Sequence, residues 1–189
     1  SGASENALHA AWSSLTYGKI NKKEILIWGG TDGFCYGYEN KTVKDADGYD
    51  LFEPLWKVDC NEPNYRKDKE GKKIPYATPP GPSELIGTPV LYDGKVYCAI
   101  GQDPEHGDGV GRLSCMDAET GKVIWKYTDV GRTISTVSIE DDLVYIAEYA
   151  GIIHCLDANS GKVYWTHDSF SRIWAVSYTH LTLPTILLV

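Results

Sequence analysis

Short runs of β-branched and aromatic residues alternate with polar turns along the chain, most regularly from Ile134 onward. Four such runs, ISTVSI, LVYIAEY, IIHCLD and VYWTHD, are separated only by EDD, AG and ANSGK. Runs of this length between turn residues predict strands. The connections are too short for helical crossovers, so consecutive strands must run antiparallel. The pattern therefore predicts a four-stranded antiparallel meander in about 40 residues.

The same pattern repeats along the sequence. The segment CMDAETGKVIWKY at 115–127 aligns with CLDANSGKVYWTH at 155–167, an offset of 40 residues, and seven of the thirteen positions are identical. A looser copy precedes them, with Trp56 in the place of Trp125 and Trp165. Insertions at about 60–83 and 102–110 account for its longer spacing. Repeats of about 40 residues with four strands each are typical of propeller blades, which stack because one sheet cannot bury both of its faces.

We therefore predict an all-β fold, with about three four-stranded blades of a larger β-propeller of seven or eight blades. Residues 1–175 form this partial propeller, with blades at about 11–59, 84–130 and 131–170, an insertion at 60–83, and the start of a fourth blade at about 171–175. Closed propellers have about four to eight blades. Two blade faces would thus be open, so we expect the isolated chain to aggregate or oligomerise unless further blades of its own chain cover them.

Two residue types in the repeat have a structural explanation. A glycine in each turn can supply the left-handed residue that closes the last hairpin of a blade, and Asp93-Gly94 can do the same earlier in the second blade. A tryptophan on the outer strand can fill the wedge between two blades and donate its indole N–H to a backbone carbonyl, with ligand stacking as the alternative. The predicted structural motif comprises Trp56, Asp117, Gly121, Trp125, Asp157, Gly161 and Trp165.

At these residues the chain resembles the pyrroloquinoline-quinone-type (PQQ-like) β-propeller repeat family, whose blades carry the motif A-x-D-x-x-T/S-G-K-x-x-W. The copies here read C-M-D-A-E-T-G-K-V-I-W and C-L-D-A-N-S-G-K-V-Y-W, with cysteine where alanine is usual. The resemblance covers about residues 11–175. Within the family, the chain is similar to secreted propellers of planctomycete-type bacteria and to the outer-membrane assembly lipoprotein. It implies a periplasmic, outer-membrane-associated or secreted protein. The fold itself hosts quinone enzymes, scaffolds and sensors alike.

Charge and cysteine content exclude some function classes. The net charge of −8 argues against a nucleic-acid partner. No stretch reaches the roughly 18 apolar residues of a membrane helix. The five cysteines include no adjacent pair and no C-x-x-C, so they give no metal or redox signature and leave an odd thiol. Quinone dehydrogenases of the family carry an adjacent Cys-Cys disulfide and a Ca²⁺ ion held by Glu and Asn, so the missing pair disfavours an enzyme.

The end of the sequence departs from the repeat. The segment VSYTHLTLPT at 176–185 has no glycine or aspartate and does not keep the register. It looks like translated sequencing adapter, and we interpret 176–189 as an adapter-derived tail, with a genuine edge strand as the alternative. The chain also begins without Met or a leader segment, which indicates a cut or processed N-terminus.

The most polar segment is the second insertion, GQDPEHGDGVG at 101–111. Carboxylates with a histidine could hold a divalent cation or contact a ligand or partner, although the spacing is not that of an EF-hand loop. The alternative is a solvated loop that hydrogen-bonds to itself. The candidate ligand or partner residues are Asp103, Glu105, His106 and Asp108.

Arg132 and Arg172 share one repeat position, just before the innermost strand of a blade. They are expected near the rim of the propeller channel, where they would collect anionic ligands or pair with carboxylates such as Asp129 or Asp168. His154 and His167, at other repeat positions, are expected to be structural.

The first insertion carries five basic residues interleaved with two acidic ones, so it is a basic partner-binding flap or a charged surface excursion. The residues are Arg66, Lys67, Asp68, Lys69, Glu70, Lys72 and Lys73.

The chain contains no nucleophile elbow, HExxH or phosphate loop. The predicted function is a non-catalytic binding or assembly scaffold in the cell envelope or outside the cell, with a protein or polysaccharide partner and no cofactor. The alternative is a fragment of a PQQ- and Ca-dependent quinoprotein alcohol or sugar dehydrogenase, in which the quinone would take hydride from a substrate carbinol.

Overall fold

The computed structural model describes residues 11–76, 78 and 81–174, and these residues fold into three four-stranded antiparallel sheets. In each sheet the strands lie in chain order. The first holds β1 (Thr16–Ile20), β2 (Lys23–Gly29), β3 (Phe34–Lys44) and β4 (Asp50–Asp59). The second holds β5 (Val90–Tyr92), β6 (Lys95–Ile100), β7 (Arg112–Asp117) and β8 (Val123–Tyr127). The third holds β9 (Ser138–Glu140), β10 (Leu143–Ala147), β11 (Ile152–Asp157) and β12 (Val163–Asp168).

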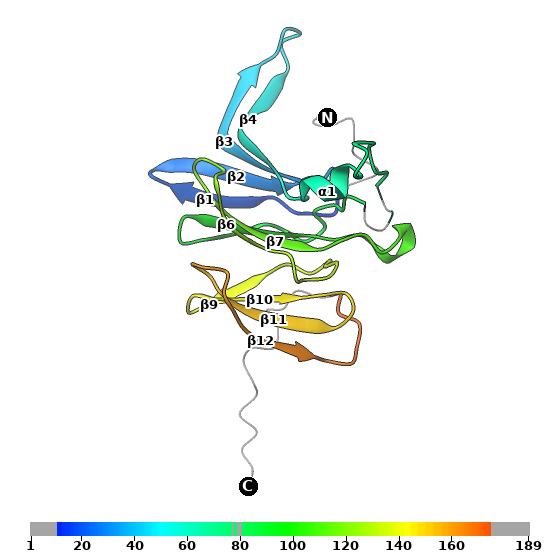
Figure 1. Ribbon diagram of the computed structural model, residues 1–189. Helices are drawn as coiled ribbons and strands as arrows, with labels where there is room; N and C mark the ends of the chain where they lie inside the picture. The colour runs from blue at the N-terminus through cyan, green and yellow to red at the C-terminus, as the bar shows by residue number, and fades with distance from the viewer. Residues whose placement is uncertain (1–10, 77, 79–80, 175–189) are drawn as a thin grey trace.

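The three sheets stack face to face, with the second between the first and the third (Figure 1). This arrangement confirms the prediction of an all-β fold built from propeller blades. Two short helical segments interrupt it, α1 (Pro63–Arg66) and the 3₁₀ turn η1 (Pro104–His106). The predicted tail at 176–189 lies outside the described residues, as does residue 175 of the predicted fourth blade. Among the described residues no helix is long and apolar enough to cross a membrane.

The hairpin turns show why the repeat conserves its spacing of aspartate and glycine. Gly121 and Gly161 have φ values of 72° and 71°, in the left-handed region that favours glycine. The Asp117 carboxylate accepts hydrogen bonds from both the backbone N–H (2.8 Å) and the hydroxyl (2.6 Å) of Thr120. The Asp157 carboxylate caps the next turn in the same way, through Ser160. These bonds lower the pKa of both carboxyl groups.

Strand register shows that the looser first copy of the repeat has the same geometry as the other two. Gly37 stands opposite Trp56, as Cys115 stands opposite Trp125 and Cys155 opposite Trp165. A Cβ atom at Gly37 would lie 2.2 Å from Cε2 of Trp56, so only glycine fits where this indole folds over its partner strand.

Two hydrophobic cores fill the spaces between the sheets. Across the first, the indole N–H of Trp56 donates to the carbonyl of Ala118 at 3.0 Å. Across the second, the indole N–H of Trp125 donates to the carbonyl of Ala158 at 2.9 Å. Both indoles are buried, whereas Trp165 on the outer strand of the third sheet is 45% exposed.

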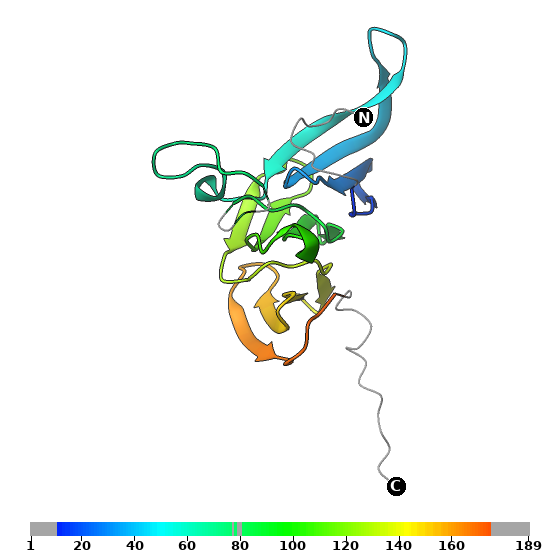
Figure 2. The ribbon, with the colours of Figure 1, turned by 90° about the vertical axis from the view of Figure 1, so that its right-hand side faces the viewer.

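The first sheet has an extension that the repeat does not predict. Strands β3 and β4 are longer than the other strands, and their far ends form an arm that projects from the stack (Figures 1 and 2). The pairing is interrupted between Tyr38 and Thr42 and resumes to Lys44, opposite Asp50. Several large apolar side chains of this arm and of β4 are exposed, namely Tyr49, Leu51, Phe52 and Leu55.

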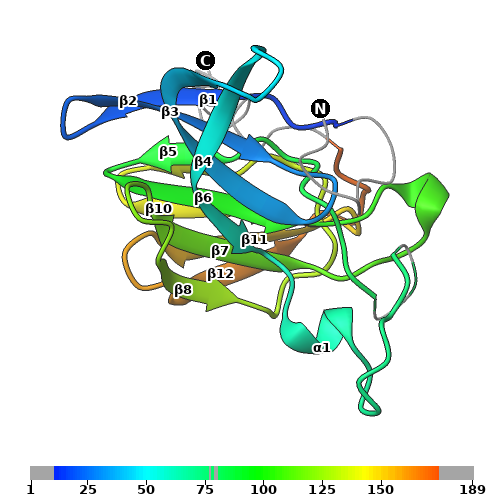
Figure 3. The ribbon, with the colours of Figure 1, turned by 90° about the horizontal axis from the view of Figure 1, so that it is seen from above.

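The connections between strands gather at two opposite ends of the stack. The tight turns β1–β2, β5–β6 and β9–β10 lie at one end, and the longer connections that carry α1 and η1 lie at the other (Figures 1 and 3). We call the second end the loop end. Both predicted insertions are therefore on the same side of the molecule.

Candidate functional site

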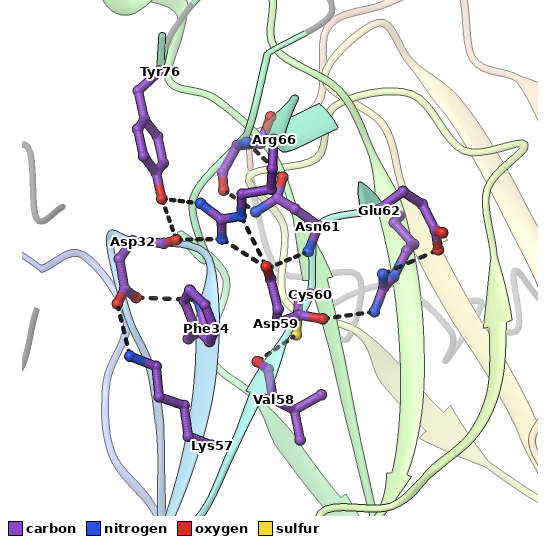
Figure 4. Close-up of polar contacts among 12 residues, drawn as sticks. Asp32, Phe34, Lys57, Val58, Asp59, Cys60, Asn61, Glu62, Arg66 and Tyr76 are labelled. Atoms are coloured by element: carbon purple, nitrogen blue, oxygen red, sulfur yellow. Dashed lines mark hydrogen bonds and ion pairs between the residues drawn. The ribbon is translucent and has the colours of Figure 1, made fainter. Parts of the chain in front are cut away.

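The loop end contains most of the buried polar groups of the described chain, and Arg66 of α1 is its most connected residue. Its guanidinium forms a two-pronged contact with Asp59, from Nε to Oδ2 at 2.8 Å and from Nη2 to Oδ1 at 2.7 Å (Figure 4). It also donates to the Asp32 carbonyl at 2.8 Å and to the hydroxyl of Tyr76. Planar bidentate pairs of this kind fix orientation as well as charge. The first insertion is therefore fastened back onto the sheet from which it departs.

The Asp32 side chain is buried beside this contact. Its Oδ2 accepts a hydrogen bond from the Tyr36 hydroxyl at 2.7 Å, and its Oδ1 accepts the backbone N–H of Phe34 at 3.1 Å. Lys57 Nζ lies 3.8 Å from the same carboxylate and 4.1 Å from the centroid of the Phe34 ring. Burial, followed by the bond to Asp32, raises the pKa of Tyr36, so its hydroxyl remains a donor.

A second set of contacts connects the first insertion to the second sheet. Glu62 accepts from Arg112 of β7 at 3.1 Å and from Lys126 of β8 at 2.7 Å. Arg112 also donates to the Asp59 carbonyl at 3.1 Å. Burial acts to raise the pKa of Glu62, but the two cations outweigh it and the pKa is lowered. The insertion thus spans the boundary between two blades.

The ends of the first insertion are held together as well. Asn61 donates from Nδ2 to the Ser83 carbonyl at 2.9 Å, and its Oδ1 accepts the Ser83 N–H at 2.8 Å. Between them, 67–73 form a charged turn in which Lys67 and Lys73 pair by one isolated bridge. Of the basic residues predicted as a flap, the half-buried Arg66 packs against the propeller, and the exposed ones are Lys67, Lys69, Lys72 and Lys73.

The second insertion is organised by its own side chains. Asp103 precedes η1 and accepts the backbone N–H of Glu105 at 2.7 Å and the Nδ1 of the His106 ring. The hydrogen bond to Asp103 raises the pKa of His106. Asp108 points outward with 81% of its side chain exposed, 3.6 Å from Nη1 of Arg132. Two of the sequence-predicted features, the acidic loop and Arg132, are thus brought together.

Arg132 and Arg172 both lie close to one aromatic ring. Their guanidinium carbons are 4.5 and 5.3 Å from the centroid of Tyr149. Arg132 also donates to the carbonyl of Gly107, and Arg172 donates to the Tyr149 hydroxyl at 3.2 Å. Within the described chain Arg132 therefore does lie near a carboxylate, but it is that of Asp108 rather than Asp129, and the contacts of Arg172 are to Tyr149.

His154 has a structural environment. Its Nε2 lies 2.8 Å from Oε1 of Glu148 and its Nδ1 lies 3.1 Å from the hydroxyl of Tyr127 on the neighbouring sheet. The Glu148 carboxylate also accepts the N–H of Gly131 at 2.8 Å. Burial acts to raise the pKa of Glu148, but the bonds from His154 and Gly131 dominate and lower it. His167 lies on the exposed edge strand β12.

Sequence reasoning missed the contacts around Asp32 and Asp59, which hold the first insertion in place. One local signal was present: Asp59 ends a strand seven residues before Arg66, a spacing that one short helical turn can close. Asp32 and Tyr76 gave no such signal, because their contact depends on how the whole insertion folds back.

The chemical character of the loop end follows from this pairing. The charges of the buried Arg112 and Asp32 and of the half-buried Arg66 are paired within the protein. The charges exposed to solvent at this end include those of the exposed parts of the two insertions. Among the described residues, no group of three or more His, Cys, Asp and Glu side chains is placed to hold a metal ion. The arrangement suits a rigid surface for binding.

Comparison with solved structures gives the same fold. BamB from Moraxella catarrhalis aligns with a TM-score of 0.60 at 14% identity, over 89% of this chain and 42% of that chain. A europium-containing methanol dehydrogenase aligns with a TM-score of 0.58 at 15% identity, over 87% of this chain and 36% of that one. The quinohemoprotein alcohol dehydrogenase ADHIIG from Pseudomonas putida HK5 aligns at 0.54 with 16% identity, over 76% of this chain and 25% of that one. The chain thus spans less than half the length of each of these relatives.

No curated protein matches the chain in sequence. One family model does, that of the outer membrane protein assembly factor BamB, over residues 53–181. The matched span begins in β4 and includes both complete copies of the Asp–Gly–Trp motif. With three stacked four-stranded meanders and the indole contacts between them, the match shows that the chain belongs to the PQQ-like β-propeller family of the BamB type.

Proposed function

We propose that the protein is a non-catalytic scaffold of the cell envelope or of the secreted fraction, and that its loop end binds a protein or polysaccharide partner. The family match to an outer membrane assembly factor is the observation that carries this proposal. The geometry adds that both insertions lie at one end and are held by internal bonds. A surface fixed in this way loses little conformational entropy when it binds.

The exposed charges of this surface define what it can recognise. The second insertion presents Glu105 and Asp108, and the turn at 67–73 presents lysines next to acidic side chains. Interspersed charges of both signs favour hydrogen-bonded contact with a polar partner surface, with specificity set by their arrangement.

Site-specific photo-crosslinking in cells that produce the protein tests the proposal. A photoreactive residue would replace Asp108 or Lys69 at the loop end, and Asp141 in the exposed β9–β10 turn at the opposite end serves as the matched control. We expect one discrete adduct from the loop-end positions and none from the control. Equal labelling at both ends, or no adduct from the loop end, would refute the proposal.

A quinoprotein dehydrogenase fragment is the second candidate, because two dehydrogenases share the fold. Such an enzyme needs ligands for its cation, and no group of three or more His, Cys, Asp and Glu side chains among the described residues is placed to hold one, so we derive no catalytic step from them. Quinone-dependent dye reduction by the full-length protein, lost on removal of divalent cations, would support this candidate over the scaffold.

A further inference from the structure

Three of the five thiols meet in the core between the first and second sheets. Cys35 lies on β3, Cys60 directly follows β4, and Cys98 lies on β6. All three are buried in one otherwise hydrophobic cluster that also contains Trp56. The Sγ atoms of Cys60 and Cys98 lie 3.6 Å apart. The Cys35 thiol lies near enough to that of Cys98 for each to shift the pKa of the other, so Cys98 has both of the other thiols as neighbours.

Clustered thiols suit either a soft metal ion or a disulfide. The described residues contain no grouping placed to hold a metal, whereas the Cys60 and Cys98 thiols are already in direct contact. These two residues are 38 positions apart and come from different sheets. A bond between them would close a loop that includes the whole first insertion.

We propose that Cys60 and Cys98 form a disulfide that covalently joins the first two blades, with Cys35 left as a thiol. The oxidant is a disulfide, either of a small thiol such as glutathione or of an oxidised dithiol protein. One cysteine thiolate attacks a sulfur of the oxidant and expels its other half as a thiolate. The second cysteine thiolate then attacks the mixed disulfide, forms the Cys60–Cys98 bond and releases the remaining half. Two protons leave the cysteines, and two electrons reduce the oxidant to two thiols.

The position of the pair determines when this bond can form. The contact with Cys98 and burial raise the pKa of Cys60 well above its ordinary value, and the contact with Cys35 together with burial does the same for Cys98. Since the thiolate is the attacking species, the folded core reacts slowly. The bond therefore forms before the two sheets close over it, and afterwards the core shields it from reductants.

Peptide mapping after refolding tests the pairing. The chain is refolded in a buffer of reduced and oxidised glutathione, alkylated, and digested with trypsin without reduction. We expect residues 58–66 linked to residues 96–112, lighter by two hydrogens than the sum of the two peptides, and an alkylated Cys35 in the peptide 24–41. Alkylation of both Cys60 and Cys98, or a link between Cys35 and Cys98, would overturn the proposal.

Thermal unfolding gives a second readout. Closing a loop of this size stabilises the oxidised chain, and we expect its Tm to exceed that of the reduced chain by about 5–10 °C. Cys60→Ala and Cys98→Ala should each abolish this difference. Cys35→Ala should keep it, as should Cys115→Ala, the matched buried thiol of the other core. A difference that disappears in Cys35→Ala would contradict the assignment, and if the variants do not fold, the peptide map of the natural chain decides alone.

Discussion

The two interfaces between the sheets share one contact and differ in almost everything around it. In both, a buried indole donates to the carbonyl of the alanine that follows the motif aspartate. In both, the turn glycine of the next blade lies against that indole, because a Cβ atom at Gly121 or Gly161 would come within 2.8 or 2.7 Å of it. This shared unit is built from motif residues of two neighbouring blades, and it therefore recurs at both interfaces.

The remaining contacts are individual to each interface. The first contains three thiols and is crossed at the loop end by the ion pairs of Glu62 in the first insertion. The second contains the Tyr97 hydroxyl, which also donates to the Ala158 carbonyl, and the Glu148–His154–Tyr127 chain. The common unit sets the spacing of blades, and the variable contacts are where stability and function can differ between blades.

The outer face of the third sheet sharpens this comparison, because its tryptophan has the same motif position but no blade against it among the described residues. Trp125→Ala removes a buried indole and its hydrogen bond, and we expect it to lower the free energy of unfolding by about 3–5 kcal/mol. Trp165→Ala, the matched control, removes a half-exposed side chain and should cost less than about 1 kcal/mol. Equilibrium urea unfolding measures both. Equal losses would mean that the indole acts within its own sheet.

Two turn glycines of the second sheet separate the cost of a left-handed backbone from the cost of crowding against Trp56 at the first interface. Gly94 and Gly121 have nearly the same φ, 70° and 72°, but only Gly121 has an indole against it. Gly94→Ala should cost about 1 kcal/mol, from the left-handed backbone alone. Gly121→Ala also displaces Trp56 and should cost about 2–4 kcal/mol. Urea unfolding of the pair measures the difference, and similar costs would show that the indole does not need the glycine.

The parts of the fold and of the candidate site that could be predicted from the sequence are those whose contacts join residues close together in the chain. The blades were predictable because strand pairing and turn closure act between neighbours, and the aspartate, glycine and tryptophan recur at fixed offsets. Contacts of the site bridge longer separations: Arg66 reaches Asp32 across 34 positions, and Arg112 reaches Glu62 across 50. No periodicity encodes them, since each occurs once. The meeting of Cys35, Cys60 and Cys98 was hidden for the same reason.

Acid should weaken both interfaces, because a carboxylate with a lowered pKa contacts each of them, Glu62 at the first and the largely buried Glu148 at the second. The pKa of Glu148 is lowered in the folded protein, so its contribution is present above its ordinary value of 4.5 and is lost as the pH falls through the lowered folded pKa. We expect Glu148→Gln to cost about 1–2 kcal/mol at pH 7 and to flatten the acid limb of stability against pH. Urea unfolding between pH 3 and 7 measures this, with Glu140→Gln, on the neighbouring strand β9 and exposed, as the control. An unchanged acid limb would mean that Glu148 does not hold the interface.

The smallest effect concerns the exposed second insertion. Asp103 raises the pKa of His106 above its ordinary value of 6.5. A raised folded pKa means that this contact is fully formed below about pH 6.5 and is lost as the pH rises through the raised value. Titration of the His106 ring by NMR should show the raised pKa in the natural chain and an ordinary one in Asp103→Asn, with Asp108→Asn as a control that leaves it raised. Because the His106 ring is exposed, the stability of the whole chain should stay the same while the loop loosens above neutral pH. If the proposed partner binds through this loop, its affinity should fall over that same range, and a constant affinity would place the contact elsewhere on the loop end.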